Sequence, residues 1–204
     1  MAEIAAIVLA AGTSRRFGAD KLLHPLTLHS SAQPLVAHSL RPWLEVFSRV
    51  TVVVGPESVA LRHVLESIGS GIHCVVCAEA GLGMGHSLAA GVSSNRDAAG
   101  WLVGLADMPL VPASAIRSVR DAIEAGAALS APFLDGRRGH PVGFSSAYCD
   151  TLLALHGDTG AREILQHNSE KIVHIAVSHK GIFADVDCPQ DLGNFTELQE
   201  EIMP

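Results

Sequence analysis

The stretch Ile4-Ala5-Ala6-Ile7-Val8-Leu9-Ala10-Ala11-Gly12 decides the fold class of this chain. Residues 4–11 form its longest apolar run, eight residues that end on small side chains. A run that is apolar at every position, rather than at alternate positions, is typical of a strand buried on both faces of a mostly parallel sheet. The run is too short for a transmembrane helix, which needs about 20 apolar residues. We therefore expect a buried strand here and no membrane association.

Similar short apolar runs recur and alternate with amphipathic segments. Six further strands are predicted at residues 50–54, 72–77, 101–106, 129–133, 142–144 and 172–177. Helices are predicted at residues 34–47, 57–68, 85–93, 112–125, 146–155, 160–167 and 189–203, the first with a kink or break at Pro42. The alternation predicts a three-layer α/β/α fold with a mostly parallel sheet. Since no linker or repeat divides the chain, we expect one domain over residues 1–204, with ligands at the carboxyl ends of the strands.

The net charge of −7 excludes one class of partner. The 204 residues include 14 Lys and Arg and 21 Asp and Glu, whereas residues 181–204 hold six acids and no base, so that residues 1–180 sum to −1. A general nucleic-acid binder needs a basic face, which this balance does not offer. Small polyanions are still allowed, because local charge can hold them. Glu3 precedes the first apolar run and Arg15 and Arg16 follow it, the reverse of a secretory signal, so we expect a cytoplasmic protein.

Two of the four cysteines, Cys74 and Cys77, form a C-x-x-C motif inside a predicted strand. Residues three apart on a strand point to opposite faces, which does not suit a shared metal ion. We expect buried free thiols here rather than a zinc site.

The loop after the first strand, residues 9–21, concentrates positive charge. Arg15, Arg16 and Lys21 lie within seven positions, among small residues whose backbone N–H groups can close around phosphate oxygens. Neither G-x-G-x-x-G nor the Walker motif is present. An ordinary solvated loop is the alternative, but so much charge directly after a buried strand favours phosphate binding.

The pattern L-A-A-G-x-S-x-R-x-G-x-x-K over residues 9–21 resembles the N-terminal signature of the nucleotidyltransferases, the MobA-like NTP transferases. Within them the chain is most similar to the branch that modifies molybdenum cofactor, and the resemblance spans residue 4 to about 192. It implies a nucleotide-diphospho-sugar-transferase (Rossmann-like) fold whose first loop wraps a triphosphate. It implies catalytic roles for Arg16 and Lys21, which would neutralise the phosphates, and nucleotide binding by Leu9, Ala10, Ala11, Gly12, Ser14 and Arg15.

A second element, Asp107-Met108-Pro109, follows the predicted strand 101–106. By its position alone, Asp107 is equally suited to cap a turn. The resemblance implies instead that Asp107 is catalytic and holds Mg²⁺ together with Asp187, since Mg²⁺ prefers one or two carboxylates plus substrate phosphates. Asp185 is the alternative second ligand. Asp191 is expected only to interact with the dipole of the last helix.

Three further segments complete the resemblance. The glycine-rich loop at residues 81–88 implies nucleotide binding by Gly83, Gly85 and Ser87, although alone it also fits a flexible turn. Residues 136–144 and 155–162 resemble the R-G-H-P-V and G-D-x-G-A-R elements of cytidylyltransferase-like members. They imply an acceptor side over residues 130–180, with acceptor binding by Arg138, His140, Asp158 and Arg162. Basic surface residues and a helix cap at Asp158 are the alternatives.

The resemblance implies transfer of CMP from CTP to the terminal phosphate of molybdenum-molybdopterin, with Mg²⁺ and release of pyrophosphate. The choice of cytidine rests on Leu9-Ala10-Ala11-Gly12, where guanylyl members more often read L-A-G-G, and on the acceptor motif. GMP transfer, transfer to another small phosphate, and a non-catalytic protein that delivers cofactor are the alternatives. A recipient molybdoenzyme or its chaperone is the expected protein partner.

Overall fold

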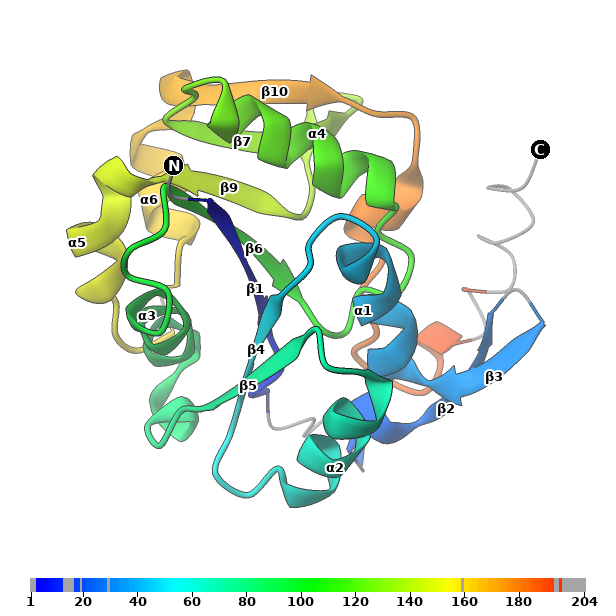
Figure 1. Cartoon of the computed structure of the whole chain (residues 1–204). Coiled ribbons are helices and arrows are strands. Elements are labelled where there is room, and N and C mark those ends of the chain that lie inside the picture. The colour runs from blue at the N-terminus through cyan, green and yellow to red at the C-terminus, as the bar shows by residue number, and fades with distance from the viewer. Residues whose placement is uncertain are drawn as a thin grey trace.

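An eight-stranded sheet forms the centre of the computed structural model, which describes residues 3–12, 17–18, 20–28, 30–158, 160–192 and 195 (Figure 1). Its order is β10-β7-β9-β6-β1-β4-β5, with β8 paired to β7. The strands are β1 (Ile4–Leu9), β4 (Val50–Val54), β5 (Ile72–Val76), β6 (Gly100–Leu105), β7 (Leu129–Leu134), β8 (Arg137–Arg138), β9 (Val142–Ser145) and β10 (Ile172–Ala176). All seven predicted strands are confirmed to within one residue at each end.

The first strand lies inside the sheet and fixes where loops gather. β1 pairs in parallel with both β4 and β6, so that Ile7 is aligned with Thr51 on one side and Val103 on the other. Parallel strands bring their carboxyl ends to one edge, which collects the loops that follow Leu9, Val54 and Leu105. The sheet is mixed because β9 runs antiparallel between β6 and β7.

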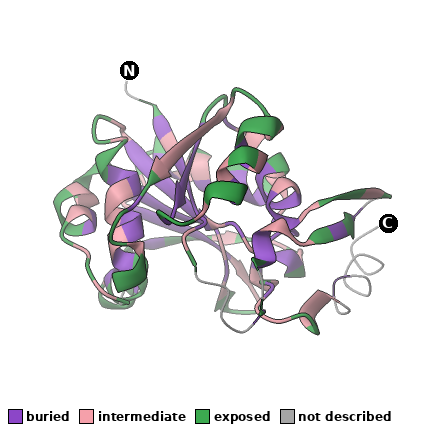
Figure 2. Cartoon of the chain, turned by 90° about the horizontal axis from the view of Figure 1, so that it is seen from below, coloured by how far each residue is buried: buried purple, intermediate pink, exposed green. Residues whose placement is uncertain are grey.

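Helices cover both faces of the sheet, as the three-layer prediction requires. One face is covered by α1 (Leu35–Leu44), α2 (Val59–Ile68) and α4 (Ala113–Glu124), and the other by α3 (Met84–Ser93), α5 (Cys149–Leu153) and α6 (Arg162–His167). Each face of the sheet packs against its helices in a separate hydrophobic core. The residues of β1 alternate between them: Ala6 and Val8 belong to the first core, and Ile7 and Leu9 to the second. Burial is therefore concentrated along the central strands (Figure 2).

Two features of the first fifty residues differ from the sequence predictions. A separate hairpin of β2 (Pro25–Leu28) and β3 (Ser31–Pro34) lies beside the main sheet and was not predicted, because its residues carry no long apolar run (Figure 1). Of the kink or break predicted at Pro42, the break is wrong, since α1 continues through Pro42 and ends at Leu44. Only two residues follow the proline, so its missing N–H affects the last turn alone.

The remaining predictions concern segments away from the sheet centre. Cys74 packs against the first core and Cys77 lies in the second, which confirms that they point to opposite faces, and burial raises the pKa of the Cys74 thiol. Most of the predicted helix 189–203 lies outside the described residues. Among the residues that are described, no helix is long and apolar enough to cross a membrane.

Candidate active site

A cavity of about 510 Å³ opens at the carboxyl edge of β1 and β6. It is bounded by the ends of these strands and by two loops that follow β5 and α5. Its lining comprises Leu9, Ala11, Gly12, Ala80, Gly81, Gly83, Met84, Ser87, Leu105, Asp107 and Asp158. Seven of the sequence-predicted site residues therefore share one cavity: Leu9, Ala11, Gly12, Gly83, Ser87, Asp107 and Asp158. The predicted residues Ser14, Arg15 and Arg16 lie outside the part of the chain that the structure describes.

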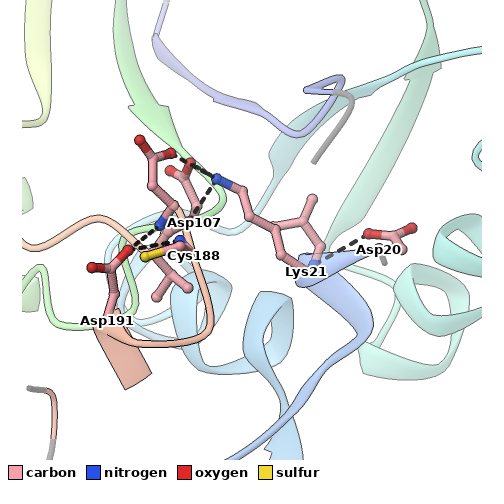
Figure 3. A network of polar contacts seen from close by, with 8 residues as sticks. Asp20, Lys21, Asp107, Cys188 and Asp191 are labelled. Carbon is pink, nitrogen blue, oxygen red and sulfur yellow. Dashed lines mark hydrogen bonds and ion pairs between the residues drawn. The ribbon is translucent and has the colours of Figure 1, made fainter. Parts of the chain in front are cut away.

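Lys21 reaches the carboxylates predicted to hold a metal ion (Figure 3). Its Nζ donates to Asp107 Oδ2 at 2.7 Å and to the carbonyl oxygen of Val186 at 2.6 Å, and lies 3.4 Å from Asp187 Oδ1. Lys21 starts the short 3-10 helix η1 (Lys21–Leu23), where the Asp20 side chain accepts from the Leu22 N–H and fixes the first turn. Because Lys21 is only 9% exposed, its ammonium is held within this cluster.

The acidic side of the cluster has unused capacity for a cation. Asp107 Oδ1 is buried and has no hydrogen-bond partner among the described residues, while Oδ2 takes the Lys21 ammonium. An orphaned buried carboxylate oxygen is costly unless a cation or donor approaches it. Partial burial raises the pKa of nearby Asp185, and the negative charges of Asp107 and Asp187 act in the same direction. The carboxylates of Asp107 and Asp187 both lie within 3.4 Å of the Lys21 ammonium, and one or two carboxylates are a donor set that suits Mg²⁺ when substrate phosphates complete it.

The segment that carries Asp187 is fixed from two directions. On one side, the Val186 N–H donates to the backbone oxygen of Asp107 at 3.0 Å. On the other, Asp191 Oδ2 accepts from the backbone N–H groups of Asp187, at 2.8 Å, and Cys188, at 2.7 Å (Figure 3). Asp191 therefore has a role in fixing this segment that its predicted interaction with the helix dipole did not include. Asp191 follows Cys188 by three residues and Asp187 by four. This spacing was the sequence signal that could have revealed the two hydrogen bonds.

The glycine-rich loop is locked to the loop after α5. The Gly85 N–H donates to the Gly157 oxygen at 2.8 Å. A Cβ on Gly83 would lie 2.2 Å from the carbonyl carbon of Gly157, and one on Gly85 would lie 2.8 Å from the His156 oxygen. These glycines therefore allow two backbones to touch, which places Asp158 in the lining of the same cavity as Gly83.

The predicted acceptor residues lie on neighbouring elements. Arg138 in β8 pairs with Phe133 of β7, and Arg162 begins α6. Partial burial lowers the pKa of Arg138, and the positive charge of Arg162 adds to the effect, so the two guanidinium groups share one region. A pair of nearby guanidinium groups suits a small anion such as a phosphate.

His140 is close enough to Arg138 and to Asp185 for both charges to act on its imidazole. Its backbone N–H donates to the Ile182 oxygen at 3.0 Å, and its Nδ1 is closed off from solvent without a hydrogen-bond partner among the described residues. Burial and, after it, the positive charge of Arg138 lower the pKa of His140 to about 4, although the negative charge of Asp185 acts in the opposite direction. The imidazole is therefore neutral at pH 7, which suits a hydrogen-bonding role rather than a charge.

Comparison with known proteins identifies the class. A family described as the MobA-like NTP transferase domain matches residues 6–172. Solved structures with this fold include proteins described as a nucleotidyl transferase and a cytidylyltransferase, and one structure of Rv0371c is a complex with manganese. The chain belongs to the MobA-like NTP transferase family.

Individual relatives cover nearly the whole chain. The purine catabolism protein PucB of Bacillus subtilis (strain 168) is 29% identical over 197 residues, which cover 91% of this chain and 92% of that protein. The crystal structure of Rv0371c from Mycobacterium tuberculosis H37Rv is 25% identical with a TM-score of 0.80, and the match covers 96% of this chain and 98% of that chain. Molybdopterin-guanine dinucleotide biosynthesis protein A from Archaeoglobus fulgidus is 19% identical with a TM-score of 0.63, over 97% and 100% of the two chains.

Proposed function

We propose that this protein transfers CMP from CTP to the terminal phosphate of molybdenum-molybdopterin and releases pyrophosphate. The observation that carries the proposal is the Lys21–Asp107–Asp187 cluster beside a cavity lined by the first loop and the glycine-rich loop. Nucleotidyl transfer depends mainly on positioning and on neutralising negative charge on the triphosphate. The Lys21 ammonium, and a cation held by Asp107 and Asp187, would neutralise the negative charge. The backbone of the two loops that line the cavity would position the nucleotide.

The donor side of the reaction uses the nucleotide cavity. Asp107 and Asp187 would hold Mg²⁺, which when bound neutralises the triphosphate and the leaving pyrophosphate. Lys21, together with Arg16 of the first loop, contributes positive charge to the same phosphates. Ser87 is buried and lines the cavity, where its hydroxyl can hydrogen-bond to the nucleoside.

The acceptor side needs charge and orientation rather than a strong base. The oxygens of an acceptor phosphate are already ionised at pH 7, so no proton has to be removed before attack. Arg138 and Arg162 would bind this phosphate and hold it in line with the α-phosphorus. His140, neutral because of its lowered pKa, can add a hydrogen bond without extra charge.

The assignment of cytidine rests on the small residues after β1. Ala11 lines the cavity at the position where guanylyl relatives more often carry glycine, and its methyl group narrows the space for a base. Transfer of GMP to the same acceptor is the alternative within this class of enzyme. A non-catalytic delivery protein would share the cavity but would have no need for the paired carboxylates.

The test is pyrophosphate release with CTP, GTP or UTP, each with and without molybdenum-molybdopterin and with Mg²⁺ present. We expect release with CTP plus acceptor, and a loss of about 100-fold or more in Asp107→Asn, which keeps the side-chain shape and removes the charge. If pyrophosphate is released with GTP and acceptor but not with CTP or UTP, the nucleotide substrate is GTP rather than CTP. No release from any of the three would reject the enzyme in favour of a delivery protein.

A further inference from the structure

Asp191 follows Asp187 by four residues and is not among the residues that line the cavity. Its Oδ2 nevertheless accepts two backbone hydrogen bonds, from Asp187 at 2.8 Å and from Cys188 at 2.7 Å. The Asp191 N–H in turn donates to the Cys188 oxygen at 3.1 Å. The hydrogen bond from the Cys188 N–H to a carboxylate three residues later is the one that half of a capping box would make.

The two hydrogen bonds act on the residue that faces Lys21. Asp187 extends its carboxylate toward the Lys21 ammonium, while its backbone N–H is tied to Asp191. Its side chain is 41% exposed, so packing alone holds it weakly.

We infer that Asp191 is a positioning residue, which orients Asp187 as the second carboxylate of the divalent-cation site. The inference rests on the proposed function only in taking Asp107 and Asp187 as the cation ligands. Groups that orient metal ligands typically contribute 10–100-fold to metal affinity or activity. Charge-assisted hydrogen bonds to backbone N–H groups are also among the stronger kind.

The test is Mn²⁺ binding, measured by the loss of the free-ion electron paramagnetic resonance signal, with and without the α,β-methylene analogue of CTP. Asp191→Ala should weaken Mn²⁺ binding by about 10–100-fold. Asp191→Asn, whose amide oxygen can still accept from the backbone, should recover most of this loss. The matched control is Asp150→Ala, which removes an acid from the first turn of α5 and should leave Mn²⁺ binding unchanged.

A double-mutant cycle separates positioning from general stability. In Asp187→Asn, the ligand is already impaired, so adding Asp191→Ala should weaken Mn²⁺ binding by less than about threefold further. Additive losses would overturn the inference, as would wild-type Mn²⁺ affinity in Asp191→Ala or no Mn²⁺ binding by the wild type. Should Asp191→Ala fail to fold, Asp191→Glu serves in its place, because the extra methylene displaces the acceptor while it keeps the charge.

Because Mn²⁺ binding needs no turnover, its outcome is independent of the proposed reaction. Mn²⁺ binding that depends on Asp191 as described, combined with no pyrophosphate release from any nucleotide, would reject the proposed function and leave this inference standing. If the wild type and Asp191→Ala release pyrophosphate equally well at limiting Mn²⁺, the proposed function stands and this inference is rejected.

Discussion

The Lys21 ammonium lies 2.7 Å from Asp107 Oδ2, joining two residues that are 86 positions apart in the chain. The contact brings the end of the first loop to the end of β6, the two segments that carry the most specific motifs of the sequence. Its surroundings are mostly closed to water: the side chains of Lys21 and Asp107 are 11% and 20% exposed. Lys21 therefore neutralises the same carboxylates that would bind a divalent cation.

Replacing Lys21 by methionine should make the protein depend more on divalent cations. Loss of the ammonium leaves the Asp107 and Asp187 carboxylates close together, which should lower the free energy of unfolding by about 1–3 kcal/mol without metal. Added Mg²⁺ should stabilise Lys21→Met more than the wild type, because no ammonium competes for the carboxylates. Urea unfolding with and without Mg²⁺ measures both effects. Equal stabilisation of the two proteins by Mg²⁺ would contradict this role of Lys21.

Replacing Gly83 by alanine should damage both the fold and the site. Gly83 has a φ of +131°, and its Cβ would clash with the Gly157 backbone, so we expect a loss of about 1–3 kcal/mol in stability. The displaced 157–158 loop should also weaken CTP binding. Gly81→Ala is the matched control in the same loop, since a Cβ there meets no atom within 4 Å. The prediction fails if thermal unfolding and CTP binding are the same for the two variants.

Replacing Arg162 by methionine should act on the acceptor and spare the nucleotide. Loss of one charged hydrogen-bond donor should raise the KM for molybdenum-molybdopterin by about tenfold or more, with little change in the KM for CTP. Arg117→Met, on the exposed face of α4, controls for the loss of one positive charge. Steady-state kinetics of pyrophosphate release checks this, and an equal rise in both KM values would assign Arg162 to the nucleotide instead.

The lowered pKa of His140 predicts a loss of stability in mild acid. The pKa is about 4 in the folded protein and about 6.5 when unfolded, so the unfolded chain binds a proton in the interval where the folded protein does not. The free energy of unfolding is therefore unaffected by His140 protonation above about pH 6.5. It falls by up to about 3 kcal/mol as the pH decreases toward 4. Urea unfolding at pH 7.5 and pH 5 should show this loss.

His140→Gln isolates the contribution of the imidazole, because glutamine cannot be protonated in this range. The difference in unfolding free energy between pH 7.5 and pH 5 should shrink in that variant. His63, exposed on α2, provides the control substitution, His63→Gln. A pH dependence in His140→Gln as steep as in the wild type would refute the assignment.

Much of the fold was predictable because burial on both faces leaves a local signature. Continuous apolar runs such as residues 4–9 can be read as inner strands without knowing their neighbours. The hairpin at residues 25–34 lacks that signature, since it pairs with itself beside the main sheet and buries only alternate residues of β2. The continuation of α1 past Pro42 was also hidden, because a helix can accept a proline when it ends soon afterwards.

The sequence by itself determined the chemical groups of the site, because residue type and position within a loop are local properties. It indicated the first loop by its positive charges and small residues, and Asp107 and Asp187 by the resemblance of their segments to family motifs. Only the tertiary structure decided which of these groups meet. The reach of Lys21 to Val186, the contact between Gly83 and Gly157, and the two hydrogen bonds of Asp191 depend on the packing of segments rather than on any local pattern. Distances across a sheet edge arise from that packing, and a linear motif does not encode them.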